Sequence, residues 1–312
     1  MALAFLFPGQ GSQSVGMVSA LAQRFPIVEE TFREASAALD LDLWQMVSSG
    51  PEEALNRTEI TQPAILSASV AMWRLWQEEG GEAPEVMAGH SLGEYSALVA
   101  ASSLSFADAV RLVAKRGELM QQAVAPGAGA MAAILGLDDA TVIRLCETES
   151  TEEGVVAAVN FNAPGQVVIA GSSSAVAAAV VAAKAEGAKR AVTLPVSVPS
   201  HCSLMLPAAE GLSQVLEKIA IHPPQIAVVN NCDVAIEREP EQIKRALVRQ
   251  LTHPVRWVES VTTMVEGGAT HFVECGPGKV LAGLNKRIVK AIPLFSILDE
   301  TSLHLAVAES RQ

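Results

Sequence analysis

The pentapeptide Gly89-His90-Ser91-Leu92-Gly93 constrains the fold of this chain more than any other sequence feature. A Gly-x-Ser-x-Gly run between an apolar stretch and a helix-forming one is typical of a nucleophile elbow, a tight strand-to-helix turn that exposes a serine hydroxyl. Glycine is needed at both ends because so sharp a turn brings backbone segments into close contact. The following helix would direct its free N–H groups and positive dipole end at the site. The pattern predicts a reactive Ser91 at the top of a sheet.

Strands and helices alternate on both sides of this turn. The expected strands are residues 3–7 and 86–89, and the expected helices are residues 62–79, 92–101 and 105–123. The first of these helices would begin at Thr61 as N-cap, with Pro63 in its first turn. Short links between alternating elements favour an α/β fold with a mostly parallel sheet that is covered on both faces.

The pattern changes after residue 126. Six segments follow in the order strand, helix, strand, strand, helix, strand, namely residues 131–135, 138–149, 155–160, 167–171, 174–186 and 189–195. This β-α-β-β-α-β order predicts a ferredoxin-like unit.

The larger pattern resumes after this unit. Helical stretches lie near residues 203–219, 240–251 and 255–266, and strands at 226–230 and 271–274. We therefore interpret residues 127–196 as a smaller, ferredoxin-like domain inserted into a larger hydrolase-like α/β domain of residues 1–126 and 197–312. The cleft between the two domains is the expected place for a substrate.

The composition argues against several classes of function. The 312 residues carry a formal net charge of −12, which disfavours general binding to nucleic acid or to an anionic membrane. The four cysteines form no CxxC pair, as expected of reduced thiols in a cytoplasmic protein. The apolar N-terminus lacks the basic segment of a signal peptide, and no apolar run approaches the ~18 residues of a membrane span. We expect a cytoplasmic protein with no metal site.

Ser91 needs a base, because an unassisted serine hydroxyl is a weak nucleophile at neutral pH. Of the six histidines, His201 lies where the smaller domain returns to the larger one, at the rim of the expected cleft. It is therefore the best candidate. His90 adjoins Ser91, but in an elbow its side chain points away, which favours a structural role. A Ser-Asp-His order would need an acid between Ser91 and His201, and the aspartates in that interval lie at expected helix starts: Asp108, Asp138 and Asp139.

Six short motifs occur in order along the chain. They are Phe7-Pro8-Gly9-Gln10-Gly11-Ser12-Gln13, Gly89-His90-Ser91-Leu92-Gly93-Glu94, Arg116-Gly117 with Met120-Gln121, Asn160-x-Asn162-x-Pro164-Gly165-Gln166, Pro195-Val196-Ser197-Val198-Pro199-Ser200-His201 and Glu274-Cys275-Gly276-Pro277-Gly278. Together they resemble the malonyl-CoA:acyl carrier protein transacylases, over about residues 4–298. The chain is similar to the stand-alone bacterial type of dissociated fatty acid synthesis rather than to a module of a megasynthase.

The resemblance implies a ping-pong transfer through an acyl-serine. Ser91 would take the malonyl group from coenzyme A, with His201 first as general base and then as general acid. In this family a backbone carbonyl, here that of Gln250, orients the histidine in place of a carboxylate.

The resemblance also implies how substrate and intermediate are held. The backbone N–H groups of Gln10 and Leu92 would form an oxyanion hole. Arg116 would hold the free carboxylate of malonate through a two-pronged, charge-assisted pair. No cofactor is expected beyond the coenzyme A that the substrate carries.

The implied acceptor is the phosphopantetheine thiol of acyl carrier protein, a strongly acidic partner. On a chain of negative net charge, its docking needs a local positive region. Two clusters are candidates: Lys279, Lys286, Arg287 and Lys290 in one helical stretch, and Lys189 with Arg190 at the edge of the smaller domain. We expect a monomer.

Other functions remain open on the residues alone. A serine esterase or thioesterase would use the same elbow, with an acidic third residue and no need for Arg116. A non-catalytic carrier-protein-binding subunit would form no acyl adduct. A nucleotide-binding loop is disfavoured because the third glycine after Gly9-x-Gly11 falls at the wrong spacing and no acidic residue ends a second strand about 20 residues on. The sequence does not determine the strictness for malonyl over methylmalonyl or acetyl, which relatives often read near residues 197–201, nor the pathway or carrier protein served.

Overall fold

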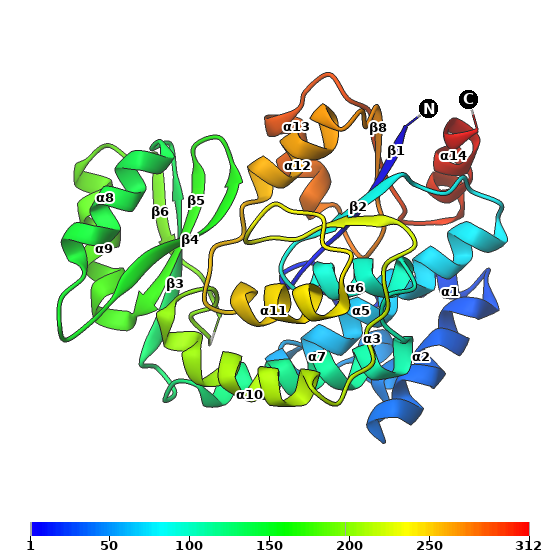
Figure 1. Ribbon diagram of the computed structural model, residues 1–312, viewed down its shortest axis with the longest axis horizontal. Coiled ribbons are helices and arrows are strands. Elements are labelled where there is room, and N and C mark those ends of the chain that lie inside the picture. Colours follow the sequence, from blue (N-terminus) through cyan, green and yellow to red (C-terminus); the bar gives the residue numbers. More distant parts are fainter. Residues whose placement is uncertain (1, 197, 312) are drawn as a thin grey trace.

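A five-stranded parallel sheet forms the centre of the larger unit (Figure 1). The computed structural model describes residues 2–196 and 198–311, so Ser197 lies outside the described residues. The strands are β1 (Leu3–Phe7), β2 (Val86–Gly89), β7 (Ala227–Val229), β8 (His271–Glu274) and β9 (Leu294–Ser296), in the spatial order β7-β2-β1-β8-β9. All four pairings are parallel, so the carboxyl ends of the strands meet at one edge.

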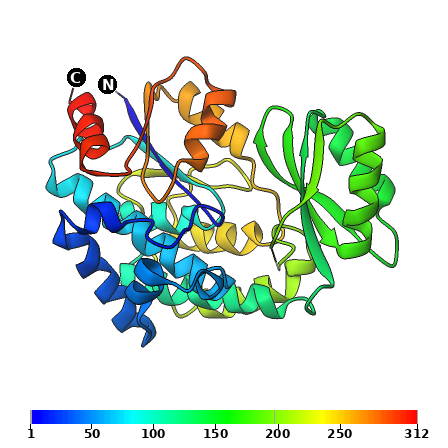
Figure 2. The same ribbon diagram turned by 180° about the vertical axis from the view of Figure 1, so that it is seen from behind.

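Helices cover both faces of this sheet, as the buried strands require. Phe5 points to one face, where it packs edge-on against Trp73 and Trp76 of α5, and Leu6 points to the other, toward Trp257 of α12. Figure 2 shows the blue and cyan helices on one side of β1 and the orange helices on the other. The helices are α1 (Ser19–Ala22), α2 (Pro26–Leu39), α3 (Leu43–Ser49), α4 (Glu52–Leu55), α5 (Thr58–Glu78), α6 (Gly93–Ala100), α7 (Phe106–Gln122), α10 (Leu206–Leu216), α11 (Pro240–Gln250), α12 (Trp257–Glu266), α13 (Val280–Ile288) and α14 (Glu300–Ser310), with a 3-10 turn at Ser203–Met205.

The smaller unit has its own antiparallel sheet and its own apolar core. Its elements are β3 (Gly129–Leu135), α8 (Asp139–Glu149), β4 (Val156–Ala163), β5 (Gln166–Ser172), α9 (Ser173–Ala185) and β6 (Arg190–Thr193), with the strand order β4-β5-β3-β6. Helices α8 and α9 pack on one face, away from the larger unit (Figure 1). The opposite face packs Met131 and Val168 against Cys202 of the larger unit. The expectation of an α/β protein with a parallel sheet and a second, separate sheet is confirmed.

Helix α5 differs from the sequence prediction. It begins at Thr58, so Thr61 is not its N-cap but a buried helical residue whose hydroxyl donates to the Leu55 carbonyl at 2.6 Å. Pro63 therefore lies inside the helix, where its missing N–H removes one backbone bond. The helix still forms because most of its residues are buried against neighbouring helices, and this packing outweighs the local signal.

Sequence patterning does not predict strand β9 or helix α14. Strand β9 has three residues, too few for a period to show. Helix α14 begins with a capping box between Asp299 and Ser302, which is a local start signal present in the sequence. None of the helices in residues 2–196 and 198–311 combines the length and the apolarity that a membrane crossing needs.

Candidate active site

Ser91 lies on the tight turn between β2 and α6, at the carboxyl edge of the parallel sheet. Its backbone φ of 52° lies in the left-handed region, which residues other than glycine rarely adopt. A Cβ added to Gly89 would lie 1.8 Å from the Gly93 carbonyl carbon, and one added to Gly93 would lie 2.0 Å from the Phe7 carbonyl oxygen. Only glycine fits at both positions, so the two glycines of the pentapeptide are what permit the turn.

His201 contacts the Ser91 hydroxyl directly. The distance between Ser91 Oγ and His201 Nε2 is 2.8 Å, and His201 Nδ1 lies 2.7 Å from the backbone carbonyl of Gln250. A carbonyl only accepts, so Nδ1 carries the proton and Nε2 is left to accept from Ser91. Burial, with the nearby Arg116 charge second, lowers the pKa of His201 to about 3. The imidazole is therefore neutral at physiological pH, the form that a general base requires.

The aspartates between Ser91 and His201 lie elsewhere. Asp108 bonds Ser105 and Arg111 on the exposed side of α7, and Asp138 caps α8 through Thr141. Asp139 is the first residue of α8. A Ser-Asp-His triad is therefore not formed with any of these three residues, and the orienting group in contact with His201 is a neutral carbonyl.

Arg116 extends from α7 toward the nucleophile and is 1 % exposed. Its Nη1 donates to Gln62 Oε1 at 2.9 Å, and its Nη2 donates to Gln250 Oε1 at 2.9 Å and to Ser91 Oγ at 3.3 Å. Its Nε has no hydrogen-bond partner among the described residues. Burial lowers the pKa of Arg116 from its ordinary value, but an arginine stays charged. The site thus holds a buried cation within reach of the reacting hydroxyl.

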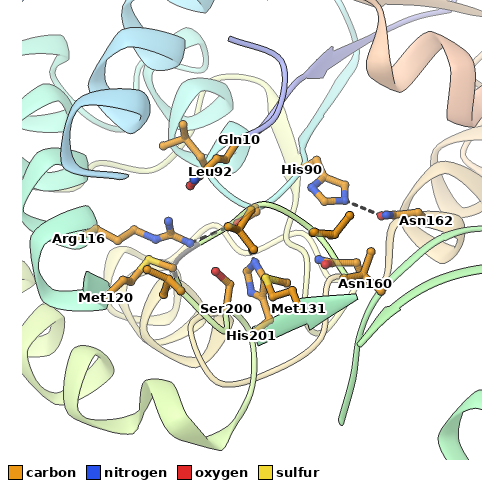
Figure 3. A pocket seen from close by; sticks show the side chains of 15 residues that line it. Gln10, His90, Leu92, Arg116, Met120, Met131, Asn160, Asn162, Ser200 and His201 are labelled. Carbon is orange, nitrogen blue, oxygen red and sulfur yellow. Dashed lines mark hydrogen bonds between the residues drawn. The ribbon is translucent and has the colours of Figure 1, made fainter. Parts of the chain in front are cut away.

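Residues of both units enclose a cavity of about 200 Å³ in front of Ser91. The larger unit contributes Arg116 and Met120, and the smaller unit contributes Met131 and Asn160 (Figure 3). Such a volume holds a small acyl group and leaves the rest of a large substrate outside. The expected position of the substrate, between the two units, therefore coincides with a real cavity.

Gln10 and Leu92 line the cavity side by side (Figure 3). Gln10 follows β1 and Leu92 is the N-cap of α6, so both lie at the carboxyl edge of the sheet. Within the described part of the chain, neither backbone amide donates a hydrogen bond. Both amides are therefore available to an oxyanion at Ser91.

His90 faces the smaller unit rather than the nucleophile. Its Nε2 lies 2.8 Å from Asn162 Oδ1, a contact that joins the two units across the cavity wall (Figure 3). This orientation agrees with a structural role for His90.

Three residues that the sequence did not assign to the site bond Ser91, Gln250 or Arg116. Asn231 Oδ1 accepts from the Ser91 amide at 2.6 Å, and Glu94 accepts from the Gln250 side chain at 2.8 Å. Gln62 bonds Arg116, as described above. Asn231 is the second residue after β7, which neighbours β2, so a polar residue just beyond a parallel neighbouring strand was the available signal.

One residue of the positive cluster of Lys279, Lys286, Arg287 and Lys290 already bonds the smaller unit. Arg287 donates to Gln166 Oε1 and, at 3.0 Å, to the Pro164 carbonyl, so its guanidinium joins the two units. Lys286 is exposed. The described residues contain no group of three or more His, Cys, Asp or Glu side chains suited to a metal ion.

Known proteins match this chain over nearly its full length. The acyl transferase domain family matches residues 4–297. The malonyl CoA-acyl carrier protein transacylase of Escherichia coli K12 is 59% identical over 306 residues, which cover 98% of this chain and 98% of that protein. The chain belongs to the malonyl-CoA:acyl carrier protein transacylase family. The resemblance carried by the six motifs is thereby confirmed.

Solved structures of this transacylase family share the fold. The malonyl CoA-acyl carrier protein transacylase from Coxiella burnetii has a TM-score of 0.99 at 48% identity, covering 100% of this chain and 98% of that one. A malonyl-transacylase solved in complex with a type II PKS acyl-carrier protein has a TM-score of 0.97 at 55% identity, covering 99% and 100%.

Proposed function

We propose that this protein transfers a malonyl group from malonyl-CoA to the phosphopantetheine thiol of acyl carrier protein and so supplies malonyl carrier protein for fatty acid synthesis. The names of its close relatives support this acyltransferase activity. One observation carries it chemically: His201 Nε2 and Arg116 Nη2 approach the same Ser91 hydroxyl, at 2.8 and 3.3 Å. A nucleophile, its base and a cation for the substrate carboxylate thus converge on one atom.

The first half-reaction forms the acyl-enzyme. Ser91 Oγ attacks the thioester carbonyl carbon while His201 Nε2 takes the hydroxyl proton. The oxyanion that forms accepts from the amides of Gln10 and Leu92. Collapse breaks the carbon–sulfur bond, and the imidazolium returns its proton to the departing coenzyme A thiol.

The second half-reaction reverses these steps with another thiol. His201 takes the proton of the phosphopantetheine thiol, whose sulfur attacks the malonyl ester of Ser91. The neutral Gln250 carbonyl stabilises an imidazolium less than a carboxylate does, which suits a base acting on activated thioesters. No step requires a metal or a bound cofactor.

Arg116 would select malonyl by pairing with its free carboxylate. Its Nε has no partner in the described structure, and its other donors are held only by neutral amide oxygens and a hydroxyl. The buried Glu94 carboxyl acts on Arg116 only at a distance, and within the described structure no hydrogen bond joins the two, so an anionic acyl group would supply the direct counter-charge that a buried cation favours. A carboxylate held there would also leave less room for a hydrolytic water, which favours transfer over the esterase or thioesterase alternative.

The fold supports a finer description. The strand order β4-β5-β3-β6 with its two helices supports a ferredoxin-like unit, and the parallel sheet with the elbow after β2 supports a hydrolase-like larger domain. We infer a smaller domain of residues 127–196 inserted into a larger domain of residues 1–126 and 197–312. We further propose that the protein acts as a monomer in the cytoplasm and binds neither nucleic acid nor membrane.

Intact-protein mass spectrometry tests the proposed function. Brief mixing with malonyl-CoA should add one malonyl group to the wild type and none to Ser91→Ala, and adding acyl carrier protein should remove it. An acetyl adduct from acetyl-CoA as abundant as the malonyl adduct would contradict the role of Arg116 but not that of Ser91. No adduct from either donor would favour the non-catalytic carrier-protein-binding subunit. An adduct that water removes as fast as carrier protein does would favour the esterase.

A further inference from the structure

Two side chains that do not line the cavity bond the backbone of Ser91. Asn231 Oδ1 accepts from the Ser91 amide at 2.6 Å, and Asn231 Nδ2 donates to the Gly89 carbonyl at 2.6 Å. Gln250 Nε2 donates to the Ser91 carbonyl at 3.0 Å. The Ser91 amide is therefore bonded to a side chain, and the Ser91 carbonyl accepts from a side chain in addition to the backbone amide of Glu94 in α6, at 3.1 Å.

Glu94 joins these two residues. Its Oε2 accepts from the backbone amide of Asn231 at 3.0 Å and from the side-chain Nε2 of Gln250 at 2.8 Å. Asn231, Gln250 and Glu94 are all buried. Buried polar networks with their bonds satisfied tend to fix a single arrangement of the groups that they join.

Gln250 links this network to the reacting atoms. Its carbonyl bonds His201 and its Oε1 accepts from Arg116. The side-chain amide of Gln250 directs its oxygen at Arg116, so its nitrogen points away from Arg116. There the nitrogen donates to the Glu94 carboxyl and to the Ser91 carbonyl. Glu94 therefore sets the orientation of the residue that contacts the base and the substrate-binding cation.

We propose that Asn231 and Glu94 are positioning residues for the acylation step. Asn231 holds Ser91 in its left-handed conformation, and Glu94 ties Asn231 to Gln250 so that nucleophile, base and Arg116 keep one geometry. This inference rests on the proposed function. Neither residue lines the cavity, so both act through the groups that they hold rather than on the substrate.

Two other buried residues provide matched controls. Glu274 accepts from the amides of Leu281 and Ala282 at the start of α13, and Asn285 accepts from the Trp257 indole. Both are as buried as Asn231 and Glu94, and neither touches a group of the site. Removing them should affect stability without affecting the geometry at Ser91.

The test compares variants with the wild type in their rate of acyl-enzyme formation. Each protein is mixed with saturating malonyl-CoA, the reaction is quenched rapidly, and the adduct is measured by intact-protein mass spectrometry. We expect Asn231→Ala and Glu94→Ala to slow acylation by about 10²-fold, because a shift of about 1 Å at a reacting group costs that much. The malonyl-CoA concentration for half-maximal rate should change less than threefold. Glu94→Gln should recover at least tenfold over Glu94→Ala, because an amide oxygen can accept both N–H groups.

The controls separate positioning from stability. Asn285→Ala and Glu274→Ala should lower the unfolding temperature and keep the acylation rate within about twofold of the wild type. Should Asn231→Ala not fold, Asn231→Ser takes its place, with the same expected loss of rate. Asn231 and Glu94 variants that react as fast as these controls would overturn the positioning role. A wild type that forms no adduct would instead overturn the proposed function itself.

Discussion

Ser91 and His201 both have left-handed backbones, with φ of 52° and 66°. Such conformations cost on the order of 1–3 kcal/mol each and persist only where the surroundings determine them. At Ser91 the surroundings are Asn231 and Gln250, which bond its amide and its carbonyl. Ser91 and His201 were singled out from the sequence, whereas the left-handed φ of Ser91 depends on partners 140 and 159 positions away.

Arg116 is predicted to decide the preference for malonyl. Arg116→Ala should lower the acylation rate constant kcat/KM for malonyl-CoA by about 10²-fold, equivalent to about 2.7 kcal/mol, because a charge-assisted contact to the carboxylate is lost. The rate with acetyl-CoA should hardly change. Arg111→Ala, an exposed arginine of the same helix, is the control and should leave both rates unchanged. Full malonyl preference in Arg116→Ala would exclude the carboxylate role.

The pH dependence of acylation should reflect the buried state of His201. The base works when neutral, and burial with the Arg116 charge lowers its pKa to about 3, so His201 should cause no loss of rate between pH 8 and pH 5. Arg116→Gln removes one lowering cause and should move the acid limb to higher pH. Rapid-quench acylation rates from pH 4 to pH 8 provide the measurement. Burial raises the pKa of Glu94 to about 7, so its titration could also change the acylation rate in this pH range. Any such change that disappears in Glu94→Gln belongs to the Glu94 carboxyl. A limb near pH 6.5 that persists in Glu94→Gln would contradict the assignment.

At the scale of elements, helix α7 brings Arg116 to the site because it packs unusually close to α5. A Cβ added to Gly117 would lie 2.7 Å from Glu59 Cα and 2.8 Å from the Thr58 carbonyl oxygen. In the Arg116-Gly117 pair of the third motif, Arg116 is the residue at the site, and Gly117 allows α7 to pack closely against α5. The sequence predicted a helix over residues 105–123, which begins after the N-cap Ser105, but not its close approach to α5.

Gly117→Ala is predicted to destabilise the protein by about 1–3 kcal/mol, because backbone atoms of α5 leave no room for the new methyl group. It should also slow acylation, since α7 must shift and Arg116 moves with it. Gly283→Ala is the matched control, a helical glycine of α13 whose added Cβ meets open space. That change should stabilise by about 0.5–1 kcal/mol. Urea unfolding of both variants measures the difference, and equal effects would refute the packing argument.

At the scale of the whole molecule, a few contacts hold the two units around the cavity. His90 bonds Asn162, and Arg287 bonds Gln166 and the Pro164 carbonyl. The backbone of β4 also pairs with Val255, whose amide donates to the Val159 carbonyl at 2.9 Å. These hydrogen bonds all reach β4, the turn after it or the first residue of β5, so this part of the smaller unit lies directly against the larger one.

Carrier-protein docking is predicted to depend on Lys286. Lys286→Glu should raise the KM for acyl carrier protein by roughly 3- to 10-fold at low ionic strength, less at high salt, because exposed charges are screened. Acylation by malonyl-CoA should not change. Lys184→Glu on α9, on the side of the smaller unit away from the larger one, is the control (Figure 1). An unchanged KM for Lys286→Glu would remove this surface from the docking site. Arg287 is unsuited to the test because it joins the two units.

The sequence by itself determined the α/β class, the separate second sheet, the elbow at Ser91 and the family, because these depend on local periodicity, on glycines at a sharp turn and on short ordered motifs. Only the tertiary structure decided which distant groups meet. Helix α5 begins earlier than predicted, and no contact forms between His201 and Asp108, Asp138 or Asp139; both results depend on packing between segments far apart in the chain. The same holds for Asn231 and Glu94, whose bonds to Ser91 and Gln250 form only when β7 lies beside β2. Local signals carry no information about such neighbours, since burial and close approach arise only when the elements pack.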